Sequence, residues 1–171
     1  MDKLLYFIQG QHSSYTDLNV NDLLHQLIEV ERKRLNSDIK IDFNPSREAA
    51  DMQGDKEQIL DLFRFLFTNC VEALDGGGFV KIDTELTNEA ILISMSDNGV
   101  GMDEHTLSRA FEPFFSTKFL GRGLGLSASY GIVKSHGGSI ELISKPQQGT
   151  TVRSRCRLHR RYNETNHFFE W

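Results

Sequence analysis

Apolar positions recur every three or four residues in four segments of the chain, which is the spacing of amphipathic helices. The four segments are residues 20–35, 56–74, 103–111 and 123–138. Asp17 or Asn21 is placed to cap the first helix, and Asp103 lies near the start of the third. The second segment is the longest, and the DGGG sequence after it is a strong helix stop. The pattern therefore predicts one long helix and three shorter ones.

Apolar and polar residues alternate, or form short β-rich runs, in five further segments. These are residues 39–43, 78–86, 90–96, 139–144 and 150–158. A TNE turn joins the second of these segments to the third, and a KPQQG turn joins the fourth to the fifth, so two hairpins are expected. Hairpins favour a mixed, mostly antiparallel sheet, with the helices gathered on one of its faces. The predicted fold class is α+β, as a two-layer α/β sandwich.

Composition agrees with this fold class and narrows the possible functions. The 171 residues are 39% hydrophobic and 25% charged, which suits one globular domain. The net charge of −5 argues against a general nucleic-acid binder, because no surplus of basic residues is available to neutralise phosphates. Cys70 and Cys156 are too few for a disulfide framework and form no metal-binding pattern, so both are expected to be reduced core thiols.

The two ends of the chain differ in character from its middle. Residues 1–17 begin with an apolar run, LLYFI, and continue as GQHSSYTD, which has the composition of a linker. This segment is either the end of a helix whose partner is missing or a frayed extension, and it is too short for a signal peptide or a membrane span. Residues 18–158 hold the predicted elements, and residues 159–171 form a tail with none.

Asn69 is the first candidate site residue, because its carboxamide points into the apolar face of the long helix. Burying an amide without a partner costs about 1–3 kcal/mol. Asn69 therefore either bonds a neighbouring backbone or faces a binding site, and the pattern alone does not choose between the two. Glu72, one turn further on, either adds a second polar group at the rim of such a site or is a solvated helix residue.

Asp97 ends a predicted strand, with its carboxylate on the same side as Met95 and two isoleucines. An apolar slot with one hydrogen-bond acceptor at its base suits the amino group of an adenine. The alternative is an aspartate that starts a turn, because DNG is also an ordinary turn sequence. Gly99 and Gly101 follow, and both would allow the backbone to approach a ligand closely.

The stretch TKFLGRGLGLS, residues 117–127, places three glycines at the start of a predicted helix. Such a turn either exposes backbone N–H groups toward an anion or serves as flexible punctuation between two elements. It is not a Walker loop, because no Gly-Lys-Ser/Thr follows and Lys118 precedes the glycines. It is also a poor dinucleotide-binding fingerprint, because no strand leads into it.

The motifs taken together and in order are more specific than any one of them. They are NCVEAL, DNGVGMD, FEPFFSTK, GRGLGLS and the GTT of residues 149–151. In this order they resemble the nucleotide-binding catalytic domain of bacterial sensor histidine kinases. That family has the Bergerat-type ATP fold (the GHKL superfamily) shared with gyrase and with a class of chaperones. The resemblance covers residues 18–158, which is most of the chain. The stub LLYFIQGQ before it resembles the tail of the second helix of the kinase dimerisation domain, so residues 1–17 are expected to be a remnant of that helix and a linker.

The resemblance assigns roles to the residues at matching positions. Asn69 corresponds to the asparagine that coordinates the Mg²⁺ bridging the phosphates of ATP. Asp97 corresponds to the aspartate that accepts a hydrogen bond from the adenine amino group, and Thr150 to the threonine that supports this pocket through water. The positions that would shape the adenine pocket or wrap the phosphates are Gly99, Gly101, Gly121, Gly123, Leu124, Gly125 and Leu126.

Residues 102–120 correspond to the mobile lid that covers ATP in the family. Phe111, Phe114 and Phe115 would attach this lid, a role that is compatible with plain core packing. Lys118 either approaches a phosphate, and so assists catalysis, or is a solvated lysine.

Two features depart from the family pattern. Phe65 stands four residues before Asn69, where histidine kinases usually carry an asparagine and gyrase-type ATPases a glutamate that activates water. Phenylalanine has no lone pair for either task. In addition, no histidine is followed by the Glu or Asp that marks a phosphate-accepting histidine, and all are expected on the surface or in loops. The six are His12, His25, His105, His136, His159 and His167.

The resemblance therefore implies an ATP-binding catalytic domain that donates the γ-phosphoryl group to a histidine on a dimerisation domain absent from this chain. Mg²⁺ would be its cofactor and the receiver domain of a response regulator a further partner, with no nucleic acid and no membrane contact by this domain. The chain alone should bind ATP but turn it over poorly. Its expected location is the cytoplasm, whether or not the parent kinase is membrane-anchored. A stand-alone serine kinase of the anti-sigma type and a non-catalytic nucleotide sensor are the alternatives.

Overall fold

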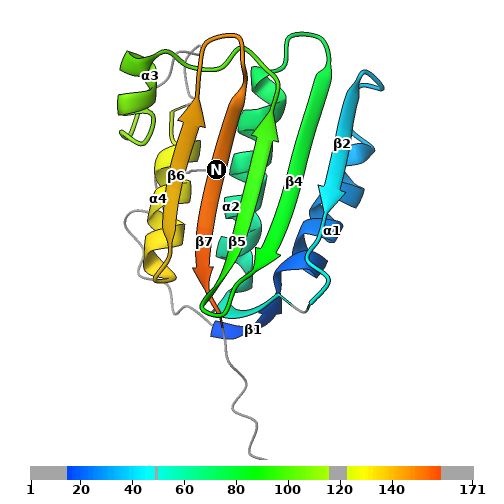
Figure 1. Ribbon diagram of the computed structural model, residues 1–171, viewed down its shortest axis with the longest axis vertical. Coiled ribbons are helices and arrows are strands. Elements are labelled where there is room, and N and C mark those ends of the chain that lie inside the picture. Colours follow the sequence, from blue (N-terminus) through cyan, green and yellow to red (C-terminus); the bar gives the residue numbers. More distant parts are fainter. Residues whose placement is uncertain (1–14, 49, 116–122, 159–171) are drawn as a thin grey trace, which may run out of the picture.

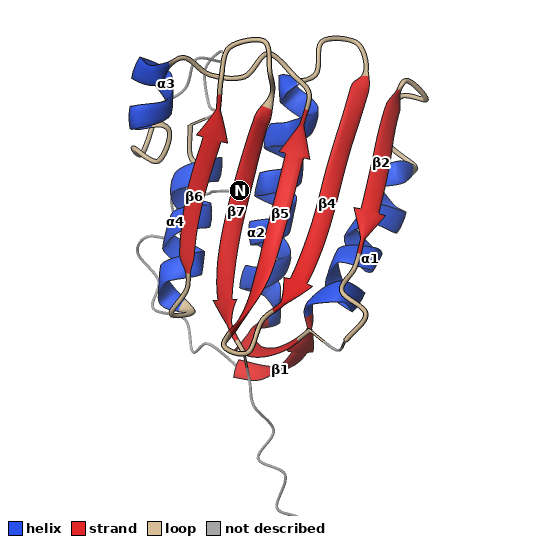
Figure 2. Cartoon of the chain, viewed as in Figure 1, coloured by secondary structure: helices blue, strands red, loops and turns tan. Residues whose placement is uncertain are grey.

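The computed structural model describes residues 15–48, 50–115 and 123–158, and its main feature is a five-stranded sheet, accompanied by a small sheet of two strands. In chain order the strands of the two sheets are β1 (Tyr15–Asn19), β2 (Ile39–Asn44), β3 (Asp51–Asp55), β4 (Gly78–Leu86), β5 (Ala90–Asp97), β6 (Ser139–Ser144) and β7 (Thr150–Arg157). The helices are α1 (Val20–Arg32), α2 (Lys56–Ala73), α3 (Glu104–Arg109) and α4 (Gly125–Ser135). The three longer helices lie behind the sheet in Figures 1 and 2. This is the two-layer α+β sandwich that the sequence predicts.

The strand order of the large sheet is β2-β4-β5-β7-β6. Only β2 and β4 in it run parallel, and the other neighbouring pairs are antiparallel, which confirms the mixed and mostly antiparallel sheet. In this register Asp97 at the end of β5 lies between Val80 of β4 and Thr150 at the start of β7. Two residues far apart in sequence therefore meet at one end of the sheet.

The core forms between the covered face of the sheet and one face of α2. The helix buries an apolar stripe of Ile59, Leu62, Phe63, Leu66, Phe67 and Cys70. In β5 the buried positions alternate, so that Asp97 points the same way as Ile93 and Met95. Each buried large apolar side chain contributes about 1.5–3 kcal/mol. A register slip of one residue in β5 would turn its buried side chains to the other face of the sheet. The direction predicted for the Asp97 side chain is thus confirmed.

Helix starts follow the capping rules, with one difference from the sequence prediction. Asn19 caps α1 by accepting a hydrogen bond from the Asp22 N–H at 3.1 Å, so the choice of Asp17 or Asn21 as the cap is wrong. Asp103 caps α3 in the predicted way, accepting from the Thr106 N–H at 2.7 Å. These bonds to its charged form hold the pKa of Asp103 below its usual value.

A second, two-stranded sheet of β1 and β3 was not expected from the sequence. The strands pair antiparallel from Tyr15 opposite Asp55 to Asn19 opposite Asp51, and they lie at the lower end of the molecule in Figure 1. Residues 15–17, which resemble a linker in composition, therefore belong to β1. Both strands are short and partly exposed, so neither carries the long apolar alternation by which a strand is recognised.

His136 lies in the turn after α4, as expected for a loop histidine, but it is buried, so the expectation of a surface position is wrong for this residue. Its Nε2 accepts a hydrogen bond from the Asp55 N–H at 3.1 Å. The ring proton is therefore on Nδ1, which lies 2.8 Å from the Ile132 carbonyl oxygen. Tyr15 stacks on the ring, with 5.2 Å between centroids. These contacts join the end of α4 to both strands of the small sheet.

The two cysteines are buried and free of disulfide, as the composition suggests. Burial raises the pKa of the Cys156 thiol to about 11. Among the helices of the described segments, none is both long enough and apolar enough to cross a membrane.

Candidate functional site

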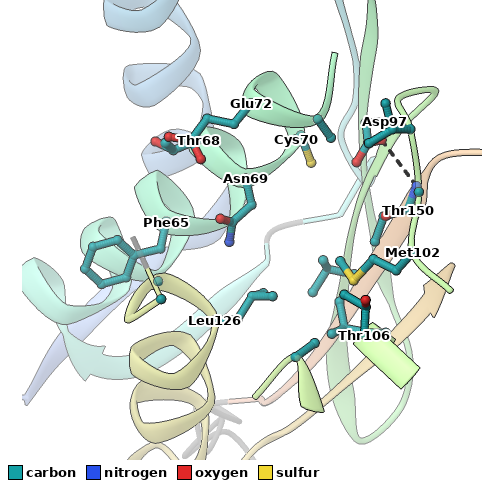
Figure 3. A pocket seen from close by; sticks show the side chains of 18 of the residues that line it. Phe65, Thr68, Asn69, Cys70, Glu72, Asp97, Met102, Thr106, Leu126 and Thr150 are labelled. Carbon is teal, nitrogen blue, oxygen red and sulfur yellow. Dashed lines mark hydrogen bonds between the residues drawn. The ribbon is translucent and has the colours of Figure 1, made fainter. Parts of the chain in front are cut away.

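A pocket of about 180 Å³ opens at the end of the large sheet where Asp97 and Thr150 meet. Its walls come from α2, α3, the start of α4 and the ends of the strands nearby. Figure 3 shows Asn69 of α2 directed into this space, with Asp97 and Thr150 on the opposite side. Most of the lining is apolar, which is the usual composition of a small-molecule site with a few polar anchors.

Asp97 is a rigidly held hydrogen-bond acceptor at one wall of the pocket. It is only 6% exposed, and its Oδ1 accepts from the backbone N–H of Gly99 at 2.9 Å and of Thr150 at 3.2 Å. The bond from Gly99 is the one expected if Asp97 starts a turn, so this interpretation of the DNG sequence is correct. The carboxylate nevertheless also faces the pocket, and the turn and site interpretations are therefore compatible.

Thr150 supports this wall through a neighbour that the sequence did not single out. Its Oγ1 lies 2.9 Å from the hydroxyl of Ser144. The Ser144 hydroxyl also donates to the Gly149 carbonyl at 3.0 Å and accepts from the Met102 N–H at 2.8 Å. Ser144 thus joins the end of β6, the start of β7 and the loop after Asp97. No local pattern marks it, because its partners are set by the register of the sheet.

The glycines after Asp97 shape the pocket through protein packing. A Cβ atom on Gly99 would overlap the Ala73 carbonyl at the end of α2, and one on Gly101 would overlap the Lys145 carbonyl. Gly101 also has a φ of +66°, which favours glycine. Gly101 lines the pocket, whereas Gly99 is not among the lining residues. The sequence predicted that a ligand would approach these two glycines closely, but in the structure the groups that pack against them are backbone carbonyls of the protein.

Asn69 presents an amide with an unmet hydrogen-bonding capacity. Its Nδ2 is buried and has no hydrogen-bond partner among the described residues. Asn69 lies against the start of α4, since a Cβ atom on Gly125 would be 3.5 Å from this nitrogen. Leaving such a donor buried and unpaired costs about 1–3 kcal/mol. Of the two alternatives left by the sequence, the structure favours the one in which Asn69 faces a site.

The start of α4 adds backbone donors beside Asn69. No side chain caps this helix at Leu124, so the first N–H groups lack the usual capping partner. Gly123, Gly125 and Leu126 line the pocket, while Leu124 does not. An uncapped helix start next to a buried amide is suited to an anion. Lys118 and Gly121 lie outside the described residues.

The phenylalanines near α3 have different environments. Phe111 contacts Tyr130 of α4, with 5.4 Å between ring centroids, and Arg109 lies 4.3 Å above the Phe115 ring. Phe115 also lines the pocket. Phe114 is 71% exposed, so plain core packing does not account for it.

Other lining residues were not chosen from the sequence as part of the site. Thr106 and Met102 border the pocket near α3, and Cys70 reaches it from α2. Glu72 and Phe65 also line it and are half-buried, so Glu72 is not simply a solvated helix residue. Phe65 lies one turn before Asn69 on α2 and close to the start of α4, since a Cβ atom on Gly125 would be 3.9 Å from the Cβ of Phe65.

Comparison with known proteins agrees with this geometry. Residues 54–160 match the family described as Histidine kinase-, DNA gyrase B-, and HSP90-like ATPase. The sensor histidine kinase ZraS of Escherichia coli K12 is 26% identical over 152 residues, which are 88% of this chain and 33% of ZraS. The chain thus spans about a third of that relative.

Two solved structures have the same fold. The catalytic domain of histidine kinase ThkA superposes with a TM-score of 0.77 and 26% identity, covering 84% of this chain and 95% of that domain. ThkA in complex with the response regulator TrrA has a TM-score of 0.72 at 24% identity, covering 84% of this chain and 41% of that one.

Fold, pocket and matches together are those of the catalytic domains of sensor histidine kinases. The chain belongs to the histidine kinase-, DNA gyrase B- and HSP90-like ATPase family, which the motif series in its sequence had already indicated.

Proposed function

We propose that this chain is the catalytic part of a longer sensor histidine kinase and that its pocket holds ATP with the adenine at Asp97. The observation that carries this proposal is the pairing, across one pocket, of a fixed buried carboxylate with a buried amide that has no partner. An ionised carboxylate only accepts hydrogen bonds, which suits the amino group of adenine. Thr150, Gly99 and Gly101 act by holding this wall in place.

The phosphates are then placed between Asn69 and the start of α4. Gly123, Gly125 and Leu126 border this region, and we assign the backbone there to the phosphates. Leu124 is at the N-cap of the helix and supports the same turn. Gly121 and Lys118 keep the roles expected from the sequence, Gly121 in wrapping the phosphates and Lys118 in approaching one of them.

The residues at Asn69 fit a magnesium ion that is bound mainly through ATP. Turning the amide about its last bond presents oxygen in place of nitrogen, and Mg²⁺ takes oxygen ligands from one or two side chains together with phosphates. When bound, the ion would neutralise charge that develops on the phosphates. What the chain itself contributes is positioning, through Asn69 and the α4 start, and exclusion of water by the apolar lining.

The acceptor in our proposal is a histidine on a dimerisation domain outside this chain. Its imidazole nitrogen attacks the γ-phosphorus, the bond to the bridging oxygen breaks, and ADP leaves. Phe65 supports transfer over hydrolysis, because the apolar side chain one turn before Asn69 cannot accept a proton from water. The same residue is the single observation in favour of a sensor without catalysis.

A response regulator is the expected recipient of the phosphoryl group in the next step. The ThkA–TrrA structure shows such a partner for that kinase, which supports a response regulator as the partner in our proposal. We place the domain in the cytoplasm, where a response regulator and ATP are both available.

The nucleotide proposal is tested by calorimetric titration of the chain with an ATP analogue and Mg²⁺. Asp97→Asn should weaken binding by roughly tenfold to a hundredfold, since a hydrogen bond to a charged acceptor contributes about 1.5–3 kcal/mol. Asn69→Ala should remove the dependence of affinity on Mg²⁺. Asp42→Asn, on the exposed face of β2, is the matched control and should bind like wild type. Binding unchanged in Asp97→Asn would contradict the proposed orientation.

The phosphoryl acceptor is tested separately with γ-labelled ATP. The chain is mixed with a histidine-bearing dimerisation domain or with a serine-bearing partner of the anti-sigma kind. Label on the histidine domain supports the proposal. Label on serine alone would favour the stand-alone kinase, and nucleotide binding with no label on either would favour the sensor.

A further inference from the structure

A second cavity, of about 840 Å³, lies at the opposite end of β7 from the nucleotide pocket. Thr150 at one end of this strand lines the first pocket, and Arg157 at the other end lines the second. The residues of the second cavity used below are Tyr15, Gln53, Glu89, His136, Arg155 and Arg157. They come from β1, β3, the turn before β5, the end of α4 and β7, close to the small sheet at the bottom of Figure 1.

The charged side chains of this cavity favour an anion. Arg155 and Arg157 are two residues apart on β7, so they lie on the same face of the strand, and both are exposed. Arg155 lies 3.2 Å from Glu89, and the two side chains are 53% and 78% exposed, so the pair is weak and open to competition. Arg157 has no ion pair within the described part of the chain. Among the residues that line the cavity, two guanidinium groups outnumber the one carboxylate, in a chain of net charge −5.

Two guanidinium groups on one strand match an oxyanion well. Arginine presents its N–H donors as a planar fork, which pairs bidentately with phosphate or carboxylate. Gln53 adds an amide to the lining, although its Nε2 already lies 3.4 Å from Asp17 Oδ1.

The cavity also has an aromatic wall whose polar atoms are already used. The Tyr15 hydroxyl donates to the Ser135 carbonyl at 3.1 Å, and both ring nitrogens of His136 are engaged as described above. The stacked pair is therefore fixed in orientation, and Tyr15 stays 48% exposed. Such a wall offers a ring face for stacking and no free N–H or O–H donor, while the Tyr15 hydroxyl oxygen can still accept a hydrogen bond.

We propose that this cavity binds a small molecule that carries a phosphate monoester on a planar ring. The phosphate pairs with Arg155 and Arg157, and the ring packs on Tyr15. A volume of this size is in the range of small-molecule sites and exceeds what a single inorganic anion fills. The proposal is independent of the proposed kinase function, because none of these six residues lines the nucleotide pocket.

The experiment uses phenyl phosphate as the probe and the complete 171-residue chain. Binding is followed by chemical-shift changes of backbone amides in ¹H–¹⁵N spectra, which separate the two pockets by residue. Saturable changes are expected at Tyr15, His136 and Arg157. Inorganic phosphate, which lacks the ring, and phenol, which lacks the charge, should each bind at least several-fold more weakly.

Variants separate a built site from general attraction to positive charge. Arg157→Gln should weaken phenyl phosphate binding by roughly tenfold, as expected for a lost charge-assisted hydrogen bond. Arg153→Gln is the matched control, because Arg153 lies on the same strand and face, pairs with Glu141 at 3.6 Å and does not line the cavity. Tyr15→Leu should remove the advantage of phenyl phosphate over inorganic phosphate.

Three results would overturn the proposal. The first is that phenyl phosphate causes no saturable chemical-shift changes at the residues of the cavity. This outcome includes the case in which other parts of the chain occupy the cavity. The second is equal weakening by Arg153→Gln and Arg157→Gln. The third is preservation of the ring advantage in Tyr15→Leu. Arg157 is exposed, so its replacement should leave the circular dichroism spectrum unchanged, and Arg157→Lys should keep part of the affinity.

Discussion

At the scale of single residues, the nucleotide pocket depends on side chains that never touch the ligand in our proposal. The Ser144 hydroxyl takes part in three hydrogen bonds, one each to Met102, Gly149 and Thr150. It thereby holds the loop after Asp97 against the turn between β6 and β7. Removing the Ser144 hydroxyl would leave the Met102 N–H and the Gly149 carbonyl without this hydrogen-bond partner, while the surrounding fold stays intact.

Ser144→Ala should lower the free energy of unfolding by about 1–2 kcal/mol and also weaken ATP binding, because the wall that holds Asp97 loosens. Urea denaturation and the titration described above measure the two effects. Ser96→Ala is the control, since among the described residues the Ser96 hydroxyl bonds only Thr151, at 2.9 Å, and Ser96 does not line the pocket. Equal losses of affinity in the two variants would contradict the role given to Ser144.

Cys156 predicts a particular dependence of stability on pH. Burial raises the pKa of its thiol from 9.0 to about 11, so the folded state keeps a proton that the unfolded state loses first. This contribution is fully present below pH 9 and is lost as the pH rises toward 11, by about 2–3 kcal/mol in total. Cys156→Ala should show a smaller decline in unfolding free energy over that interval. An identical decline would mean that the thiol does not contribute.

At the scale of elements, the junction between α2 and the loop after β5 fixes the width of the pocket. The Ala73 carbonyl at the end of α2 accepts a hydrogen bond from the Val100 N–H at 3.1 Å. Gly99 packs against the same carbonyl with no room for a Cβ atom. The distance between the helix that carries Asn69 and the strand that carries Asp97 is therefore set by backbone contact.

Two glycine replacements test this junction with opposite expected signs. Gly99→Ala should destabilise the fold by about 1–3 kcal/mol, because the added methyl group forces α2 and the loop apart. Gly131→Ala is on an exposed part of α4, where the new carbon would have no neighbour within 4 Å among the described residues beyond the helix's own backbone, and it should stabilise the fold by about 0.5–1 kcal/mol. Urea midpoints measure both. If the urea midpoint shifted in the same direction in both variants, the contact between Gly99 and the Ala73 carbonyl would not be the cause of the Gly99→Ala effect.

At the scale of the whole molecule, the sequence predicts well what depends on local periodicity. The apolar stripe of α2, the two hairpins and the direction of Asp97 all follow from spacing along a single element. That Asn69 and Asp97 border one pocket did not follow from spacing. It came from the family resemblance, because periodicity gives a direction for each side chain but no distance between elements.

What the sequence could not predict depends on pairing between distant segments. β1 and β3 are short and polar, and each is a strand only because the other lies beside it. The burial of His136 likewise comes from Tyr15 and Asp55, which are remote in sequence. The partners of Ser144 are set by the register of β6 against β7. No window of neighbouring residues contains this information.

The position of β7 in the sheet also dictates when the binding pocket can exist during synthesis. β7 is the last strand of the described chain, yet it lies between β5 and β6, and β6 has no other partner in the sheet. The Thr150 N–H that bonds Asp97 is 53 residues further along the chain. A nascent polypeptide that has emerged only as far as residue 149 thus carries both Asn69 and Asp97 but lacks one wall between them. Nucleotide affinity is therefore gained only after residue 150 has emerged, when β7 inserts between two strands made before it.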